Sequence, residues 1–166
     1  MKTWIVKIDE DNISKKDMEQ LGKIIADGGL VAFPTETVYG LGANAFCNNA
    51  VEKIFKAKGR PSDNPLIVHI ADVSDLSKVV REVPESAKLL FEKFSPGPLT
   101  VILKKSDKLC DRVTAGLDTV AVRIPSDKIA RELISSSGVP IAAPSATISG
   151  RPSPTPARHV ISDMDG

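Results

Sequence analysis

The sequence predicts an α/β fold, an open sheet with helices packed on it, in one domain that spans residues 1–166. Two observations lead to this prediction. Short apolar or alternating segments, typical of strands, take turns along the chain with amphipathic segments, typical of helices. The length of 166 residues also suits a single domain with its own core, since domains commonly have about 100–200 residues.

The N-terminal part begins with alternating side chains over residues 3–8, which predict a strand. Ser14 can cap the helix that follows, because its hydroxyl can accept an amide of the first turn, and the glycines at 28–29 end that helix. The apolar residues 30–33 predict a buried strand. Residues 35–46 are rich in hydroxyl groups and glycine, so we expect a loop over the sheet edge.

The middle of the chain continues the alternation. Residues 50–58 have apolar side chains at helical spacing, and Gly59 suits the position just after a helix. Residues 66–70 are apolar and predict a strand. Residues 85–94 predict a helix, and the strongly apolar residues 99–103 predict another strand.

The C-terminal part repeats the same order of elements. Residues 119–124 alternate and predict a strand, and residues 127–135 predict a helix for which Ser126 is the candidate cap. Residues 141–143 predict a short strand. A loop rich in proline, serine and threonine follows, and residues 157–161 predict the start of a last helix.

Composition excludes several classes of protein. The formal net charge of +1 argues against a protein that holds nucleic acid by overall charge alone. The two cysteines, Cys47 and Cys110, lie in no metal-binding spacing, and we expect free thiols in a reducing compartment and no metal site. No apolar run approaches the roughly 18 residues that span a bilayer, and no signal peptide is recognised, so we expect a cytoplasmic protein without membrane contact.

One glycine pattern resembles a nucleotide-binding motif but lacks its context. Residues 40–45 match G-x-G-x-x-A, the dinucleotide-binding pattern, which should follow a strand at once and open a helix. Here residues 34–39 intervene, and the next predicted helix begins only near residue 50. We interpret these glycines as turn positions. The chain also has no Walker-type phosphate loop, serine nucleophile elbow or H-E-x-x-H helix.

Four stretches are polar where a core would be apolar: residues 34–42, residues 58–65, the pair Thr119 and Arg123, and residues 144–153. Taken singly, each can be explained by capping, turns or solvated surface. Three of them follow the ends of predicted strands, where open α/β sheets bind their ligands. Together their hydroxyl groups and cations suit a phosphate and a small zwitterion.

Five segments in order resemble the YrdC-type threonylcarbamoyl-adenylate synthase family. They are PTETVYGLG, KGRPSDNPLIVHI, SPGPLTVIL, TVAVRIP and APSATISGRPSPT. The resemblance implies a YrdC-like twisted, open, mixed sheet, and an enzyme that makes L-threonylcarbamoyladenylate from L-threonine, bicarbonate and ATP, releasing pyrophosphate. It implies Mg²⁺ with the ATP, and it implies proteins that transfer the threonylcarbamoyl group to the adenosine beside the anticodon of tRNA.

The resemblance also implies roles for particular residues. Lys58 and Arg60 would bind the ATP phosphates and stabilise the charge that develops as pyrophosphate leaves, which makes them the expected catalytic residues. The other expected ATP-binding residues are Asn64, Thr119, Ser145, Thr147 and Ser153. The expected threonine-binding residues are Thr35, Thr37, His69, Arg123 and Ala143. No protein nucleophile is apparent, so catalysis would depend on positioning and charge stabilisation.

The chain departs from the family pattern in two ways. Thr147 stands where the family usually has asparagine, and a single hydroxyl cannot replace both the carbonyl and the amide of that side chain. Family members also continue past the position of Gly166, so we expect this domain to lack its C-terminal part. The alternative function is a YrdC-like RNA-binding or ribosome-associated module without synthase activity, which would use the lysines near residue 58. A carbamoyl-adenylate chemistry like that of hydrogenase maturation factors is a further alternative.

Overall fold

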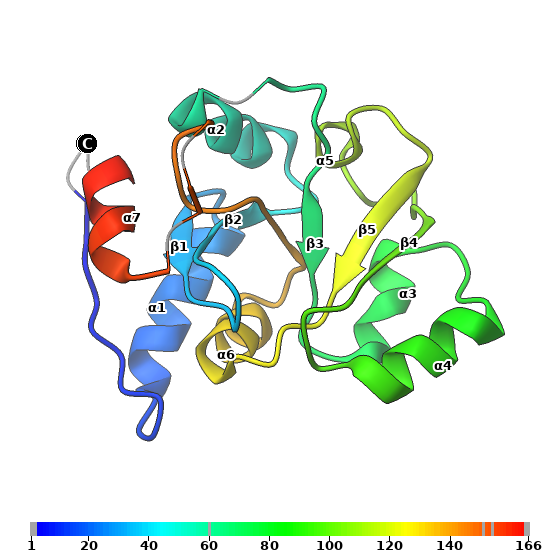
Figure 1. Cartoon of the computed structure of the whole chain (residues 1–166), viewed down its shortest axis with the longest axis horizontal. Coiled ribbons are helices and arrows are strands. Elements are labelled where there is room, and N and C mark those ends of the chain that lie inside the picture. Colours follow the sequence, from blue (N-terminus) through cyan, green and yellow to red (C-terminus); the bar gives the residue numbers. More distant parts are fainter. Residues whose placement is uncertain (1–2, 60, 151, 154, 165–166) are drawn as a thin grey trace.

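The computed structural model describes residues 3–59, 61–150, 152–153 and 155–164, which form one sheet with helices on both faces (Figure 1). The sheet has six strands in the order β1-β2-β6-β3-β5-β4. Strands β3 and β5 pair in parallel, and the other neighbours pair antiparallel. The predicted α/β class with an open mixed sheet is confirmed.

Most predicted elements are present within a few residues of their expected bounds. The strands span Val31–Phe33 (β1), Gly40–Asn44 (β2), Ile67–His69 (β3), Thr100–Lys104 (β4), Thr119–Arg123 (β5) and Ile141–Ala143 (β6). The helices span Lys15–Ala26 (α1), Asn48–Lys58 (α2), Leu76–Val79 (α3), Glu85–Phe94 (α4), Asp111–Thr114 (α5), Lys128–Ser137 (α6) and Ala157–Met164 (α7), with a 3₁₀ turn at Val73–Asp75 (η1). Among the described helices, η1, α3 and α5 were not predicted, because a single turn is too short to show a helical period.

The helix caps follow the expected chemistry with one exception. The Ser14 hydroxyl accepts the backbone amide of Asp17 at the start of α1. Gly59 ends α2 with a φ of 57°, a left-handed conformation that glycine adopts without strain. The prediction of Ser126 as the cap of α6 is wrong. Asp127 caps that helix, and its carboxylate accepts the amide of Ala130.

The predicted strand over residues 3–8 is wrong. This segment has no strand partner among the described residues, and the Trp4 side chain remains 54% exposed. Only Ile8 packs against the core from here. Alternation predicts which side chains face inward, but a strand also needs a neighbour for its backbone hydrogen bonds.

The predicted loop over residues 35–46 is also wrong in its second half, which forms β2, the second strand from one edge of the sheet. The glycines in it are not turn residues but allow a close approach. A Cβ on Gly42 would lie 2.6 Å from Cγ2 of Ile141 and 2.8 Å from Cε1 of Phe33. The neighbours of β2 occupy the space that larger side chains would fill, so the strand consists mainly of small residues. Its composition is therefore not typical of a strand, and the sequence did not predict it.

Two hydrophobic cores cover the two faces of the sheet. One contains side chains of α2, α3 and α4 and the inward side chains of β5, Val120 and Val122. The other lies between α1, α6, β1 and β6, and α1 and α6 pack side by side (Figure 1). Because side chains alternate along a strand, Thr119, Ala121 and Arg123 lie on the face opposite to that of Val120 and Val122. The second core covers this opposite face only in part.

Replacing Gly22 with alanine is expected to destabilise the fold. Gly22 is buried in α1, and an added Cβ would lie 2.6 Å from the carbonyl carbon of Ser136 in α6. Backbone atoms cannot rotate away, so the two helices must separate. We expect the free energy of unfolding to fall by about 1–3 kcal/mol, although alanine has the better helix propensity. Urea denaturation measures this difference.

The exposed residue Gln20 of the same helix provides the control. Gln20→Ala should change the free energy of unfolding by less than about 0.5 kcal/mol. A stabilised Gly22→Ala protein would contradict the close helix contact.

Candidate functional site

A cavity of about 240 Å³ opens on the partly covered face of the sheet. Its lining combines the loop between β1 and β2, the start of β3 and the end of β6 with side chains of β3 and β5. The lining residues are Thr35, Val38, Tyr39, Gly40, Pro65, Leu66, Ile67, His69, Arg123, Ala143, Pro144 and Ser145. Four of the five predicted threonine-binding residues are among them.

The position of the cavity differs from the predicted one. We expected a site beyond the carboxyl ends of parallel strands. In the structure β6 runs antiparallel to β3, so that Ala143 at the end of β6 pairs with Ile67 at the start of β3. The cavity therefore lies over the face of the sheet. His69 and Arg123 reach it from the same face, because they pair across β3 and β5.

Arg123 is the centre of the charged network in this site. Its Nη2 lies 2.9 Å from Oε1 of Glu36 and also donates to Oγ1 of Thr37 at 3.1 Å. Its Nε is buried and has no hydrogen-bond partner among the described residues. The guanidinium group is therefore held at one end and retains an unused donor. Sequence reasoning missed Glu36, although it lies within the polar stretch that contains Thr35 and Thr37.

The loop before β2 is held by a directed chain of hydrogen bonds. Thr35 Oγ1 donates to the carbonyl of Val38 at 2.6 Å, which uses its only proton. Thr37 must then be the donor in the 3.1 Å contact between the two threonine hydroxyls. Both hydroxyl protons are thus used within the loop, and Thr37 keeps a lone pair for Arg123.

His69 is a neutral imidazole in this environment. Its side chain is 4% exposed and packs edge-on against Phe33, with ring centres 5.9 Å apart. Burial, and secondarily the charge of Arg123, lower the pKa of His69 to about 4. Its Nδ1 is buried without a hydrogen-bond partner among the described residues. The imidazole therefore lines the cavity without adding a second positive charge.

The lowered pKa of His69 predicts a pH-dependent stability. The unfolded chain binds a proton near pH 6.5, whereas the folded chain binds it only near pH 4, so stability falls as the pH drops through this window. We expect His69 to contribute a loss of roughly 2 kcal/mol in the free energy of unfolding between pH 7 and pH 5. His69→Gln should abolish most of this slope in urea denaturation at several pH values. The other histidine, the exposed His159, is the control, and His159→Gln should keep the slope.

Lys58 lies outside the lining of the cavity, in contact with the loop after β6. It is 2% exposed, and its Nζ donates to the backbone oxygens of Ser145 and Thr147. The carbonyl of Lys58 accepts the amide of Ser149 at 3.1 Å. Lys58 thus attaches this loop to the end of α2.

Thr147 connects the same loop to the last helix. Its hydroxyl donates to Oδ2 of Asp163 at 2.7 Å, and the amide of Ile148 lies 3.4 Å from that oxygen. The Thr147 side chain, 3% exposed, is therefore directed toward α7. The loop is therefore held by contacts to two different helices, through Lys58 of α2 and through Asp163 of α7.

Comparison with known proteins places this arrangement in a family. The model of the family Sua5/YciO/YrdC, described as telomere recombination, matches residues 23–166. The chain belongs to this family. The resemblance to YrdC-type proteins that the five motifs indicated is thereby confirmed.

Several members of the Sua5/YciO/YrdC family are very similar to the chain. Threonylcarbamoyl-AMP synthase of Bacillus subtilis is 56% identical over 99% of the chain and 48% of its own length. The synthase of Pyrococcus abyssi is 60% identical over 86% of the chain and 42% of its own length. The crystal structure of P. abyssi Sua5 complexed with L-threonine superimposes with a TM-score of 0.94 at 55% identity, covering 97% of the chain and 47% of that protein. The chain thus spans about half the length of these relatives.

The remaining residues that the family resemblance singled out, where the structure describes them, lie outside the cavity lining. Asn64 and Ser153 are exposed in loops, and Thr119 is half-buried at the start of β5, on the same face as Arg123. Arg60 lies outside the described residues. The structure therefore brings the predicted threonine-binding residues together more closely than the predicted ATP-binding residues; of the latter that the structure describes, Ser145 alone lines the cavity.

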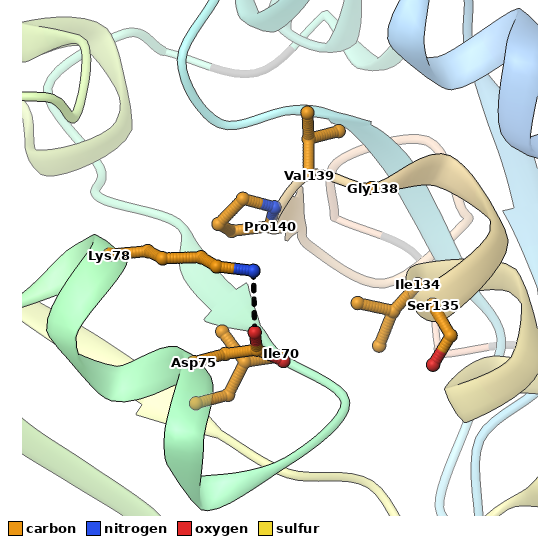
Figure 2. Close-up of a pocket in the computed structure, with 8 residues that line it drawn as sticks. All are labelled: Ile70, Asp75, Lys78, Ile134, Ser135, Gly138, Val139 and Pro140. Atoms are coloured by element: carbon orange, nitrogen blue, oxygen red, sulfur yellow. Dashed lines mark ion pairs between the residues drawn. The ribbon is translucent and has the colours of Figure 1, made fainter.

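A second cavity, of about 180 Å³, lies between η1, α3 and the end of α6 (Figure 2). Its polar groups include a surface ion pair in which Lys78 Nζ lies 2.7 Å from Oδ1 of Asp75. Its apolar wall comes from Ile70, Ile134 and Pro140. Among the predicted site residues that the structure describes, none lines it, so the cavity over the sheet face is the candidate site.

Proposed function

We propose that this chain contains the centre of an L-threonylcarbamoyladenylate synthase, a nucleotidyltransferase that uses L-threonine, bicarbonate and ATP and releases pyrophosphate. The observation that carries the proposal is the cavity at Arg123, where the guanidinium group, held by Glu36, and the neutral imidazole of His69 line a space for a small polar ligand. Identity of 56–60% to synthases over most of the chain supports it.

The threonine-binding part of the proposal rests on charge. The planar fork of Arg123 suits the substrate carboxylate, because it can bind two oxygens at once. His69 and Ala143 would contact the rest of the amino acid, while the Thr35 and Thr37 hydroxyls hold the loop that completes the cavity. The P. abyssi relative that was crystallised with L-threonine supports this assignment.

The nucleotide would lie toward the loop after β6. We propose that Lys58 and Arg60 stabilise the phosphates; the carbonyl oxygens that hold Lys58 are uncharged and leave its positive charge in place. The further contacts proposed for ATP are Asn64, Thr119, Ser145, Thr147 and Ser153. Mg²⁺ would enter with the phosphates, since no three His, Cys, Asp or Glu side chains of the described residues are grouped as ligands.

Two reactions follow from these placements. The threonine amine attacks the carbon of bicarbonate, so that a carbamate forms and water leaves. An oxygen of the carbamate then attacks the α-phosphorus of ATP, forming the acyl–phosphate bond as the bond to pyrophosphate breaks. Arg123 would orient the first reactant and Lys58 would stabilise the departing charge.

The partners follow from the proposed product. We expect the adenylate to pass to the proteins that transfer the threonylcarbamoyl group to tRNA, and we expect the chain to work in the cytoplasm with them. None of the described helices has the length and apolar character needed to cross a bilayer. The alternative of RNA binding through the lysines of α2 has less support, because Lys56 pairs with Glu52 at 2.9 Å and Lys53 donates to the carbonyl of Gly28.

Pyrophosphate release tests the proposal. The chain is incubated with ATP and Mg²⁺, with L-threonine and bicarbonate added singly and together. Release that requires both is the expected result. Release that is independent of L-threonine would overturn the proposal, because the chain would then use ATP in another reaction. No release, combined with salt-sensitive RNA binding, would favour the RNA-binding alternative.

A further inference from the structure

Thr147 links the last helix to the lysine proposed for the ATP phosphates. Its side-chain hydroxyl donates to Oδ2 of Asp163 in α7 at 2.7 Å, and its backbone carbonyl accepts a hydrogen bond from Nζ of Lys58 in α2. The amide of Ile148 lies 3.4 Å from the same carboxylate oxygen. Asp163 therefore holds the segment that in turn holds the charged end of Lys58.

The two ends of this loop have other supports. Near its start, the amide of Ala146 donates to the carbonyl of Tyr39 at 2.7 Å, and at its end the amide of Ser149 donates to the carbonyl of Lys58 at 3.1 Å. The middle of the loop, residues 147–148, is attached through side chains, those of Lys58 and Asp163. A change at Asp163 should therefore loosen the middle of the loop without detaching its ends.

Lys58 depends on this loop for the position of its ammonium group. A lysine side chain has a flexible four-carbon stem, so the groups around its tip decide where the charge lies. Here the side chain is 2% exposed, and Nζ donates to the carbonyls of Ser145 and Thr147. Displacing the Thr147 carbonyl would remove one of the contacts that place this charge.

We infer that Asp163 is a positioning residue for the nucleotide site, because it holds Thr147 and, through the carbonyl of Thr147, places the positive charge of Lys58 beside the phosphates of ATP. This inference deepens the proposed function and rests on it. A misplacement of about 1 Å can cost roughly 100-fold in rate even when the change lies far from the reacting atoms. A residue two contacts away from the phosphates can therefore control how well they are bound.

The chemistry of Thr147 suits this role. A hydroxyl has one proton, and that of Thr147 goes to Asp163 at 2.7 Å, since the carbonyl of Ile148 lies farther away at 3.5 Å. Phosphate oxygens accept hydrogen bonds, so this hydroxyl has no proton left for ATP while its contact with Asp163 is in place. Thr147 therefore serves the nucleotide through the position of its backbone.

The alternative is that Asp163 only attaches α7 to the rest of the domain. This helix has apolar contacts of its own, because Val160 is 6% exposed within the core that also contains side chains of α2, and Met164 packs against the same core. The helix should therefore stay docked when the contact between Asp163 and Thr147 is removed. The position of the loop and the docking of the helix can thus be tested separately.

Calorimetric titration of variants at Asp163 tests the inference. ATP with Mg²⁺ and, separately, L-threonine are titrated without bicarbonate, so that no adenylate forms. We expect Asp163→Leu to weaken ATP binding by about 10-fold or more and to change L-threonine affinity by less than about 2-fold. Asp163→Asn keeps an oxygen that can accept the Thr147 hydroxyl, so its ATP affinity should stay within about 3-fold of the wild type. Ser162→Ala, at an exposed neighbour in α7, is the control and should change neither affinity.

Amide hydrogen exchange tests the position of the loop without any ligand. The amide of Ser149 donates to Lys58 and not to Asp163, so it reports on the loop beyond the contact that is removed. Asp163→Leu should speed its exchange by at least about 10-fold. The amide of Ile70, which donates to the carbonyl of Arg123 in the sheet, should exchange as in the wild type.

Each other outcome has a definite meaning. Equal weakening of both ligands with faster exchange at both amides would overturn the inference, because Asp163 would then stabilise the whole domain. Unchanged ATP affinity, or weaker ATP binding without faster exchange at Ser149, would overturn it as well. A wild-type chain that binds no ATP would instead contradict the proposed function, and exchange at Ser149 would still show whether Asp163 positions the loop.

Discussion

Replacing Arg123 with methionine is expected to reduce L-threonine affinity by at least about 100-fold, since two charge-assisted hydrogen bonds are lost and each contributes about 1.5–3 kcal/mol. The same change should lower the free energy of unfolding by about 1–3 kcal/mol, because the Glu36 carboxylate, only 19% exposed, loses its partner. Calorimetric titration and urea denaturation measure the two effects separately.

A double variant separates binding from stability at this site. In Arg123→Met combined with Glu36→Gln no charge remains unpaired at the site, so part of the lost stability should return. L-Threonine affinity should not return, because the carboxylate still has no cation. Recovery of threonine binding in the double variant would show that Arg123 is not the carboxylate-binding residue.

The second large effect is expected for Lys58→Met. Methionine has a similar length but no donors, so the partly buried carbonyl of Ser145 and the buried carbonyl of Thr147 lose a hydrogen-bond donor and the loop after β6 loosens. The free energy of unfolding should fall by about 1–3 kcal/mol. Pyrophosphate release should fall by at least about 100-fold, because the lost positive charge no longer stabilises the phosphates.

Lys56→Met is the matched control on the same helix. Lys56 is exposed and pairs with Glu52, so its loss should change stability by less than about 0.5 kcal/mol and leave pyrophosphate release intact. A Lys58→Met protein that is less stable but equally active would support the structural role of Lys58 and would contradict the role of Lys58 at the phosphates.

The helices and the β-branched strands were predictable because their determinants are local. The spacing of apolar residues predicted α1, α2, α4 and α6, and the alternation in β5 placed Thr119 and Arg123 on one face. Ser14 and Gly59 marked helix ends through hydrogen bonds to nearby residues. Five motifs in order were enough to predict the family.

Strand β2 could not be predicted in this way, because it consists largely of small residues. These residues are needed because side chains from distant parts of the chain pack closely against the strand. Gly42 is required by Phe33 and Ile141, which approach it from neighbouring strands. The segment over residues 3–8 failed for the opposite reason. Its pattern suits a strand, yet no partner is available among the described residues.

The sequence by itself determined the fold class, most of the elements and the types of side chain at the site. Only the tertiary structure decided that Glu36 meets Arg123 across 87 positions of the chain, that Lys58 is held by the loop after β6, and that the cavity lies over the sheet face. Propensity and periodicity act between neighbours along the chain. Ion pairs, desolvation and strand direction depend on which distant segments the folded core brings together.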